Sequence, residues 1–503
     1  MIFLPVNKID DKADFVEKVL VYIRLVEVFA ERNKLDINDG SASNAQICKE
    51  LVDMGVIEKE NDLSLLKKVL LEECDRFIKA LSFAITHKNE VGSLLDKLNN
   101  KKRLALQNKE KKKSKPNFVD FFAGAGGLSY GFLQAGFKVC FANDFEEVCV
   151  KTYQYNHPEL SCNKVVQNDI RKIVDDIDKY IDEPIDVVVG GPPCQGFSSA
   201  NKQRIIDDPR NDLYKYYIKA IRKILPKFVV MENVHGMLSV ANQVVEDYEA
   251  IHEKKNGKTY SYKIAYRLLN SVDFSVAQSR ERLIYIAIRN DVANEKKVTP
   301  ETIFADIENN NKGKPHFILQ DALDYIKPLD APRIKNQNEV DNENTGKKID
   351  VNQFDGDENA YLKLINGNRK IPYIFNHKAR YLSDVNYEIY RLLNPGDDAT
   401  DPKIAHIMPY AHRNHCFKDK YFKLVAEKPA RTITAHLRMD CHSHIHPSQI
   451  RALTPREAAR CQSFPDDYLF LGAYLKTYMQ IGNAVPCLMA KVVGFFRQEK
   501  PVS

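Results

Sequence analysis

The stretch FVDFFAGAGGLSYGF, residues 118–132, joins a short apolar run to a helical pattern through a turn that is rich in glycine. The β-branched and aromatic residues at its start indicate a buried strand, and the apolar spacing after Gly127 indicates a helix. A glycine turn between them lets a ligand approach the backbone and the N-terminus of the helix. This stretch therefore predicts the first strand–helix unit of a sheet that carries a ligand at its edge.

The same alternation continues along the chain. Further short runs are KVCFAND, KVVQND, DVVVGG, KFVVMEN and RLIYIAIR, and stretches with helical periodicity such as DLYKYYIKAIRKILP lie between them. Strands that alternate with helices form βαβ units, so we predict an α/β fold with a doubly wound, mainly parallel sheet. Ligands of such sheets bind beyond the carboxyl ends of the strands. The residues that directly follow each strand are therefore the candidates for chemistry.

The rest of the chain divides by its composition. Residues 1–100 have apolar residues at helical spacing and predict a helical accessory region, either a bundle for docking or DNA contact or an adaptor without its own function. The basic segment 101–116 is predicted to be a linker, either solvated or in contact with a polyanion. The strand–helix alternation occupies 117–290 and is lost over 291–440, which we expect to be an inserted domain. Helical patterning returns over 441–503.

The overall composition is that of an ordinary globular protein. The 503 residues are 44% apolar and 28% charged, with a net charge of +6 that permits nucleic-acid binding without demonstrating it. No apolar run reaches the length of a membrane span, and acidic residues come too early for a secretory signal. Ten cysteines without a CxxC pair suggest reduced thiols, so we expect a cytoplasmic protein.

Three strand ends share a chemical theme. Gly124 lies in the first turn, Asp144 ends the next strand candidate, and Asp169 ends the third. A carboxylate at the second position suits the two hydroxyls of a ribose, and Asp169 could accept a hydrogen bond from an adenine amino group. Either aspartate alone could equally be a helix N-cap. Together they predict a ligand that contains adenosine.

A thiol follows the fourth strand in VVVGGPPCQGFSS, residues 187–199. Cys194 is a candidate nucleophile if its surroundings favour the thiolate; the alternative is an inert thiol in the core. Pro192 and Pro193 restrict the backbone and help to keep such a nucleophile in place.

Two further groups belong to the same predicted edge. Glu232 directly follows the fifth strand, so its carboxyl group should emerge there. Arg280 and Arg282 lie two residues apart in QSRERL, on one face of an extended segment. Paired guanidiniums suit a carboxylate, a phosphate or the rim of a polar base, and surface salt bridges are the alternative.

These motifs together resemble the cytosine-C5 DNA methyltransferases. DFFAGAGGLSYGF, GGPPCQGFS, MENV, QSRERL and QIGNAVP occur in the order and spacing of that family, and RALTPREAARCQSFPDDY resembles its block before the last motif. The resemblance covers roughly residues 117–500. It implies a Rossmann-like fold that uses S-adenosylmethionine, a target-recognition region over 291–440, a C-terminal part over 441–503 that returns to the catalytic domain over 117–290, and a prokaryotic restriction–modification role.

The resemblance also implies the mechanism. The Cys194 thiolate would add to C6 of a cytosine flipped out of the duplex, and Glu232 would contact the N3 and amino edge. C5 would then take the methyl group, and loss of the C5 proton and the thiolate would restore the ring. Arg280 and Arg282 would hold the base or a neighbouring phosphate and favour the thiolate.

The cofactor contacts transfer by motif as well. Phe122 and Phe145 would pack on the adenine, Asp144 would bind the ribose, and Asn483 would complete the methionine pocket. The full set is Phe122, Gly124, Gly126, Asp144, Phe145, Asp169, Ile170, Pro193, Leu213, Asn483 and Val485.

DNA contacts are expected from two segments. The polar stretch 198–212 is predicted to be the loop that closes over flipped DNA, with a plain surface loop as the alternative. The expected contact residues are Gln195, Ser198, Lys202, Arg204, Thr432 and Thr434. Histidines between His406 and His446 invite a zinc site, but their spacing fits no closed pattern, so we expect no metal.

The sequence thus predicts a DNA cytosine-5 methyltransferase with double-stranded DNA as its partner, a cognate restriction endonuclease as a candidate second partner, and no membrane association. One alternative is an RNA (tRNA) cytosine-5 methyltransferase, against which the large insert argues. The other is a DNA-binding regulator on an inactive scaffold, which the presence of Cys194, Glu232, Arg280 and Arg282 does not support.

Overall fold

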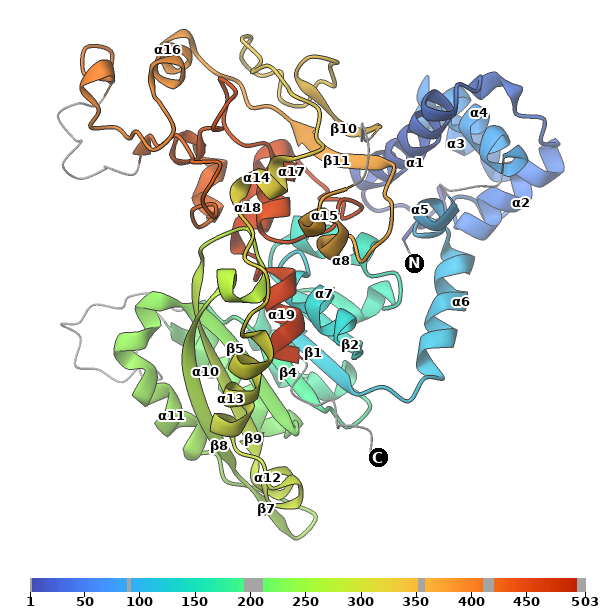
Figure 1. Cartoon of the computed structure of the whole chain (residues 1–503). Helices are drawn as coiled ribbons and strands as arrows, with labels where there is room; N and C mark the ends of the chain where they lie inside the picture. The colour runs from blue at the N-terminus through green and yellow to red at the C-terminus, as the bar shows by residue number, and fades with distance from the viewer. Residues whose placement is uncertain (1, 88–91, 194–210, 352–357, 410–419, 495–503) are drawn as a thin grey trace.

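The computed structural model describes residues 2–87, 92–193, 211–351, 358–409 and 420–494. Its centre is a seven-stranded sheet in the order β3-β2-β1-β4-β5-β9-β8 (Figure 1). The strands are β1 (Asn117–Phe121), β2 (Lys138–Asp144), β3 (Val165–Gln167), β4 (Val187–Gly190), β5 (Phe228–Val234), β8 (Tyr262–Asn270) and β9 (Glu281–Arg289). β1 to β5 are parallel, whereas β9 is antiparallel to both its neighbours. The predicted doubly wound, mainly parallel sheet is confirmed.

Helices cover both faces of this sheet, because successive strand residues point to opposite sides. Phe118 of β1 packs into one core, and Val119 and Phe121 pack into the other. The first core is covered by α7 (Gly127–Gln134), α8 (Glu147–Asn156), α13 (Pro300–Asn311) and α19 (Cys487–Gly494). The second is covered by α9 (Ile170–Asp175), α10 (Asp212–Ile224) and α11 (Ala241–Glu249).

The sheet extends beyond the predicted strands in one place. β8 was not among them, because the exposed side chains of Lys263 and Arg267 interrupt the apolar residues of this edge strand. The short hairpin β6 (Glu253–Lys255) and β7 (Lys258–Tyr260) precedes it.

The helical layer also continues past the predicted boundary at residue 291. α12 (Asn290–Lys296) follows β9 directly, and α13 packs on β8 through the buried side chains of Ile303, Phe304 and Ile307. These three belong to the core of the sheet, so residues 291–311 are part of the doubly wound unit rather than of an insert.

The N-terminal region is helical, as its periodicity predicts. Its helices are α1 (Lys12–Asn33), α2 (Asn44–Met54), α3 (Leu63–Leu70), α4 (Glu73–Thr86), α5 (Gly92–Asp96) and α6 (Asn100–Lys111). α6 occupies most of the predicted basic linker. It is held by Arg103, whose Nη2 donates to the Gln154 carbonyl at 2.7 Å, and by Gln107, whose side chain donates to the Pro158 carbonyl at 3.1 Å. No described helix is both long and apolar enough to cross a lipid bilayer.

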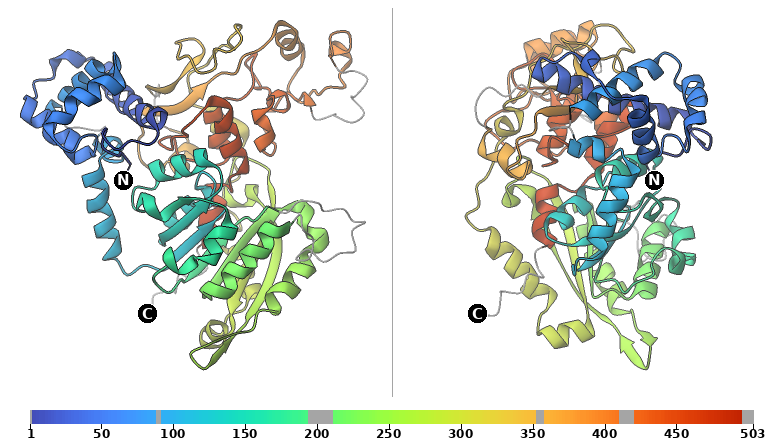
Figure 2. Two further views of the ribbon diagram at one scale, coloured as in Figure 1. Left: turned by 180° about the vertical axis from the view of Figure 1, so that it is seen from behind. Right: turned by 90° about the vertical axis from the view of Figure 1, so that its right-hand side faces the viewer.

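The N-terminal helices are joined to the rest of the molecule through a shared apolar core. They lie to one side of the sheet, next to β10 (Gly346–Val351) (Figures 1 and 2). Their core includes seven buried residues from later in the chain: Tyr155, Cys162, Ile349, Tyr373, Phe375, Leu469 and Leu471. The accessory region is therefore packed into the fold and is not a tethered module.

The remaining elements lie above the strand ends. β10 pairs antiparallel with β11 (Tyr373–Lys378). The short helices of this part are α14 (Leu319–Leu323), α15 (Ala360–Ile365), α16 (Asp384–Leu392) and the 3₁₀ turn η12 (Ala435–Arg438). α17 (Pro455–Cys461) and α18 (Tyr474–Asn483) then lead the chain back to the sheet through α19.

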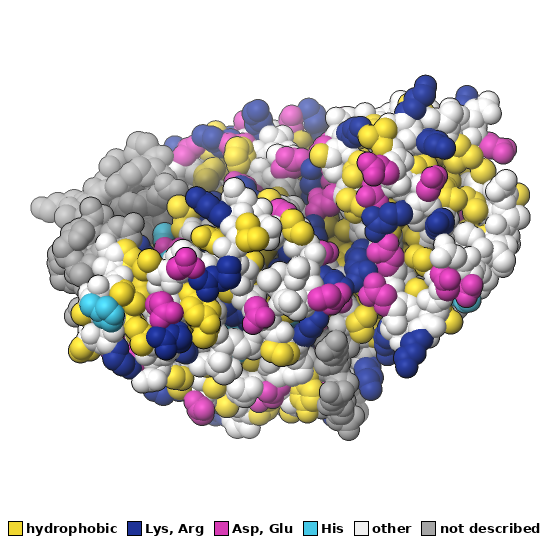
Figure 3. Space-filling view, turned by 90° about the horizontal axis from the view of Figure 1, so that it is seen from above, with side chains coloured by type: hydrophobic (Ala, Val, Ile, Leu, Met, Phe, Trp, Pro, Cys, Tyr) yellow, Lys and Arg dark blue, Asp and Glu magenta, His cyan; other side chains and the backbone are white. Residues whose placement is uncertain are grey.

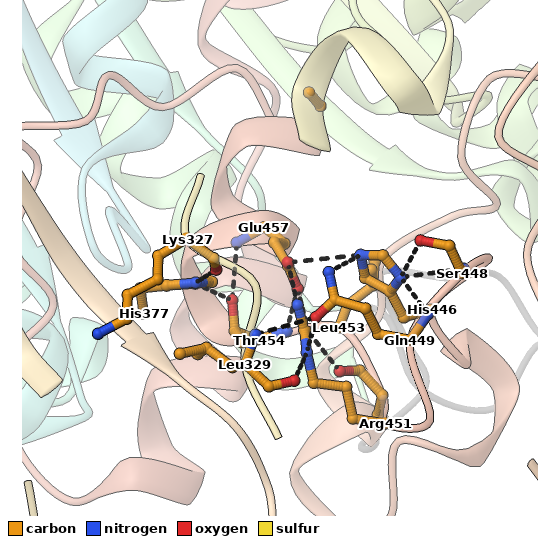
Figure 4. Close-up of polar contacts among 12 residues, drawn as sticks. Lys327, Leu329, His377, His446, Ser448, Gln449, Arg451, Leu453, Thr454 and Glu457 are labelled. Carbon is orange, nitrogen blue, oxygen red and sulfur yellow. Dashed lines mark hydrogen bonds and ion pairs between the residues drawn. The ribbon is translucent and has the colours of Figure 1, made fainter. Parts of the chain in front are cut away.

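A buried ion pair organises the start of that return (Figure 4). Both terminal nitrogens of Arg451 lie 2.7 Å from the carboxylate oxygens of Glu457, and neither side chain is exposed. Burial alone would raise the pKa of Glu457, but Arg451 holds it well below its ordinary value. His377 lies on the other side of this carboxylate, with its pKa lowered to about 3 by burial, and joins Thr454 to the Lys327 carbonyl. A buried pair of this kind is costly to break from one side, so it fixes α17 in place.

We expect deletion of residues 2–111 to destabilise the remainder severely. It would expose the seven side chains that later segments contribute to the shared core. The large apolar ones are each worth about 1.5–3 kcal/mol when buried, against a total stability of about 5–15 kcal/mol for a typical domain. Thermal unfolding and binding of a hydrophobic dye would measure the effect. A soluble fragment that melts cooperatively at the temperature of the full chain would contradict the shared core.

Candidate active site at the carboxyl ends of the parallel strands

A cavity of about 780 Å³ lies where the carboxyl ends of the parallel strands meet. This volume is in the range of small-molecule sites. Every predicted cofactor residue except Gly126 lines it, namely Phe122, Gly124, Asp144, Phe145, Asp169, Ile170, Pro193, Leu213, Asn483 and Val485. Glu232 lines the same cavity. The structure thus brings together residues from seven separate segments of the sequence.

The glycine turn has two glycines with different tasks. Gly124 has φ +54°, and a Cβ added there would meet nothing within 4 Å, so its backbone faces open space at the cavity. Gly126 has φ +97°, and a Cβ there would lie 2.5 Å from Nε2 of His157 and 2.7 Å from the hydroxyl of Tyr468. Gly126 therefore permits close packing beneath the turn instead of lining the cavity.

Asp144 shapes the turn as well as lining the cavity. Its Oδ2 accepts a hydrogen bond from the Gly124 N–H at 2.8 Å, and its Oδ1 accepts one from the Glu146 N–H at 2.8 Å. Burial raises the pKa of Asp144, and the two N–H groups offset part of that rise. Each carboxylate oxygen keeps further acceptor capacity for a ligand.

Two more residues after strand ends line the cavity: Phe145, after β2, offers an aromatic face, and Asp169, after β3, offers a second carboxylate. The Phe145 side chain is 70% exposed although it is large and apolar, which leaves its ring free for stacking at the cavity rim. Asp169 is the N-cap of α9: its Oδ1 accepts from the Arg171 N–H at 2.9 Å. A hydrogen bond from the Arg171 side chain lowers the pKa of Asp169. The N-cap alternative is thus observed in a residue that also lines the cavity.

A buried polar chain supports the glycine turn from β1. The Ser129 hydroxyl donates to Oδ2 of Asp120 at 2.6 Å, and the Tyr153 hydroxyl donates to Ser129 at 2.7 Å. Asp120 is fully buried and its Oδ1 has no hydrogen-bond partner. Burial raises the pKa of Asp120 to about 7. The motif FVDFF contains this aspartate, but nothing in the sequence marked it as functional.

Glu232 and Arg282 form a pair beside the loop that leads to Cys194. Nε of Arg282 lies 2.7 Å from Oε1 of Glu232. A Cβ on Gly191 would lie 2.9 Å from Oε2 of Glu232, so only glycine lets this carboxylate approach the loop. Asn233 donates from its side chain to the Pro192 carbonyl at 2.9 Å and fixes the start of the loop. Arg282 therefore holds the carboxylate, and Gly191 leaves room for it beside the loop.

The comparison with known proteins agrees with this geometry. A sequence profile of the C-5 cytosine-specific DNA methylases matches residues 116–495. The chain belongs to this family of methylases. The type II methyltransferase M1.HphI of Haemophilus parahaemolyticus is 32% identical over 386 residues, which cover 75% of this chain and 85% of that protein. M.DdeI of Desulfomicrobium norvegicum is 30% identical over 396 residues, covering 75% and 87%.

A solved structure supports the fold. A protein of E. coli, described as a DNA modification methyltransferase encoded within a prophage, superimposes with a TM-score of 0.55 at 23% identity, covering 76% of this chain and 98% of that one. The predicted family and activity of this methylase, methylation of cytosine C5 in DNA, are confirmed by its family membership. Neither the RNA methyltransferase nor the inactive regulator is favoured.

Arg280 of the methylase has a different environment from the one expected. Its side chain is fully buried, with Nη1 donating to the Ile433 carbonyl at 2.6 Å and Nη2 donating to the Gly482 carbonyl at 3.0 Å. Burial lowers the pKa of Arg280 to about 9. The two arginines therefore do not act as a pair: Arg282 lies with Glu232, and Arg280 joins backbone segments.

The predicted DNA contacts are described only in part. Cys194, Gln195, Ser198, Lys202 and Arg204 lie outside the described residues. Thr432 donates from its hydroxyl to the Ser279 carbonyl at 2.9 Å, and Thr434 is exposed at the N-cap of η12. Thr432 therefore lies against the QSRER segment, and the backbone of Thr434 lies against Gly482 of α18.

The histidines of the methylase serve packing in the part of the chain that is described. The His442 ring stacks on Tyr421 with centroids 4.5 Å apart, and burial lowers the pKa of His442, His444 and His446 to about 4 each. Within the described ranges no group of three or more His, Cys, Asp or Glu side chains is arranged to hold a metal ion.

We expect Asp120→Asn to change how the stability of the methylase depends on pH. Because the pKa of Asp120 rises to about 7 on folding, from about 4 when unfolded, the folded state holds an extra proton between these values. The free energy of unfolding then falls as pH rises through that window, by up to about 1.4 kcal/mol per pH unit. Asparagine does not titrate and so removes this pH dependence. From pH 5 to pH 7 the free energy of unfolding of the variant should therefore rise relative to that of the native chain.

Urea unfolding at pH 5, 6 and 7 measures that difference. Asp182→Asn, at an 82% exposed side chain, is the matched control and should show a constant offset. A constant offset for Asp120→Asn as well would mean that the buried carboxyl group does not titrate in this range.

Proposed function

We propose that the chain transfers a methyl group from S-adenosylmethionine to C5 of a flipped cytosine in a specific short DNA sequence, as the modification enzyme of a restriction–modification system. One observation carries this proposal: a single cavity joins the strand ends suited to an adenosine ligand with Glu232 and with Pro193, the residue before Cys194. The type II names of the relatives support the restriction–modification role.

The cavity fits the cofactor by the chemistry of its groups. The exposed Phe145 ring offers a stacking face, Asp144 and Asp169 offer acceptors for hydroxyl and amino groups, and the open backbone at Gly124 allows close approach. When bound, S-adenosylmethionine supplies an electrophilic methyl group on a cationic sulfur. The ligand carries no phosphate, which agrees with carboxylates at the strand ends of the cavity.

The residues of this chain carry out the other steps of the proposed reaction, those on the cytosine ring. We assign to Cys194 the attack on cytosine C6, which forms an S–C6 bond and makes C5 nucleophilic. We assign to Glu232 the hydrogen bonds to the N3 and amino edge, since Arg282 holds its carboxylate and Gly191 leaves room for it. After methylation the C5 proton leaves, the S–C6 bond breaks, and the ring regains its double bond. Arg280 acts indirectly, by holding the strand that carries Arg282.

The wider assignments follow from this activity. Double-stranded DNA is the substrate, and we assign target recognition to the elements around β10, β11 and α16 and to residues 430–440. A restriction endonuclease that reads the same site is the expected partner. An enzyme that modifies the DNA of a prokaryotic host works in the compartment that holds it, the cytoplasm around the nucleoid.

We expect Cys194→Ala to abolish methyl transfer and to retain DNA binding, because the variant lacks only the thiolate. Bisulfite sequencing of host DNA after expression of each protein would show protected cytosines in one short recurring context for the native chain alone. A gel-shift titration with DNA that carries this context would measure binding by the variant.

Two outcomes would count against this mechanism. Protected cytosines with the variant would exclude the thiolate. Soluble native protein without any protected cytosine would move the activity away from DNA, and incorporation of a labelled methyl group into RNA would then be the next measurement.

We expect Asp144→Ala to weaken binding of S-adenosylmethionine by about 1–3 kcal/mol, because it leaves the ribose hydroxyls and the Gly124 N–H without their acceptor. Asp144→Asn, which retains one acceptor oxygen, should lose less. Titration calorimetry in the absence of DNA measures both, with Glu183→Gln, which is not among the residues that line the cavity, as the control. Equal dissociation constants for all four proteins would remove Asp144 from the cofactor site.

A further inference from the structure

Helix α1 contacts three segments that belong to different parts of the enzyme. The family match begins at residue 116, so this helix lies outside it. The acidic face of α1, which we define as Asp11, Asp14 and Glu17, meets basic and N–H donors from later segments of the chain. Lys151 of α8 lies 2.9 Å from Asp11 and 3.5 Å from Asp14.

Glu17 makes the central contact. Its Oε1 lies 2.6 Å from Nζ of Lys348, on β10, and accepts a hydrogen bond from the Gly472 N–H at 3.0 Å. Burial alone would raise the pKa of Glu17, but Lys348 and the Gly472 N–H hold it below its ordinary value. One carboxylate oxygen therefore binds a strand of the recognition region and a turn of the C-terminal part.

Both partners of Glu17 lead to functional parts of the molecule. The Gly472 turn directly precedes α18, which ends at Asn483 on the cavity. A Cβ on Gly472 would lie 2.3 Å from the Val148 side chain of α8, so this turn packs closely on α8. A second contact links α1 to β10. Nε of Arg24, on α1, donates to the carbonyl of Ile349 at 3.0 Å, one residue beyond Lys348.

The other strand of the pair, β11, is held by the C-terminal segment that contains α17 and Phe470. Asn376 of β11 exchanges two hydrogen bonds with the backbone of Phe470, at 2.9 and 3.0 Å, and Nε of Arg456 donates to the Phe375 carbonyl at 2.6 Å. The β10–β11 pair is thus clamped between α1 and α17.

The charges on this side of the molecule do not suit a polyanion. Figure 3 shows acidic and basic side chains interspersed over the face seen from above, without one sign prevailing. The carboxylates of α1 already pair with Lys151 and Lys348, so these two lysines are engaged within the molecule instead of with DNA phosphates. This arrangement argues for a role within the enzyme and against direct DNA contact by α1.

We infer that Glu17 is a positioning residue that couples the recognition strand β10 to the turn before α18, so that α1 sets the orientation in which the recognition region presents DNA to the cavity. The inference rests on the proposed methyl transfer to DNA. It predicts that loss of Glu17 weakens use of the cognate DNA and leaves cofactor binding intact.

The test uses the full chain and three variants: Glu17→Gln, Glu17→Ala and Lys348→Met. Transfer of a labelled methyl group is measured on a duplex that contains the sequence found by bisulfite sequencing, and on the same duplex with one recognised base pair changed. Glu17→Ala should raise the KM for cognate DNA about tenfold and reduce discrimination between the duplexes, with the dissociation constant of S-adenosylmethionine unchanged. Glu17→Gln keeps the acceptor for Gly472 and should show a smaller rise.

Controls separate the possible outcomes. Glu73→Gln removes a carboxylate whose partner, Arg76, lies on the same helix, and should leave KM unchanged. If Glu17→Ala does not fold, Lys348→Met tests the same contact from a partly exposed position. An unchanged KM in folded variants, or an equal loss of cofactor affinity, would overturn the inference. A native chain without activity would instead refute the proposed function.

Discussion

The buried guanidinium of Arg280 holds together three segments that build the candidate active site. Arg280 directly precedes β9, the strand that carries Arg282, and its guanidinium binds the carbonyls of Ile433 and Gly482, which lie 153 and 202 residues further along the chain. A Cβ on Gly482 would lie 2.1 Å from the Thr434 backbone, so the two bound segments also touch each other. A charge at this depth is tolerated only because the carbonyls replace its water. The Glu232–Arg282 pair and the Asn483 wall of the cavity depend on this junction.

The C-terminal segment around α17 also depends on buried guanidinium groups. Arg451, Arg456 and Arg460 are all fully buried. Arg451 pairs with Glu457, Arg460 pairs with Asp466 at 2.7 Å, and Arg456 binds backbone carbonyls. Apolar packing tolerates small shifts, whereas a satisfied buried charge has one arrangement and a high cost for any other. This core can therefore fix the recognition elements above the cavity, at the point where the chain returns to the sheet.

Local patterns predicted the parts of the fold and site that depend on local sequence. The parallel strands and the residues at their ends follow from short motifs, because the carboxyl ends of parallel strands meet at one edge. β8 was missed because an edge strand whose apolar residues are interrupted by exposed charged ones carries a weak signal. The packing role of Gly126 and the backbone contacts of Arg280 could not be predicted, because their partners, such as Tyr468, Ile433 and Gly482, are hundreds of residues away. Where Cys194 and the polar stretch after it lie remains a prediction from the sequence.

The N-terminal helices supply a core that the β10–β11 strand pair cannot form alone. Two paired strands are marginally stable in water, and the polar, Asn-rich segment before β10 supplies little apolar surface to bury. Ile349, Tyr373 and Phe375 of the β10–β11 pair are nevertheless buried, because the N-terminal helices provide the core against which they pack. A strand pair with the proposed role in DNA recognition must hold its contacts at a fixed distance from the base that is modified. The cover on both sides of β10–β11 gives the pair that rigidity without enlarging the central sheet.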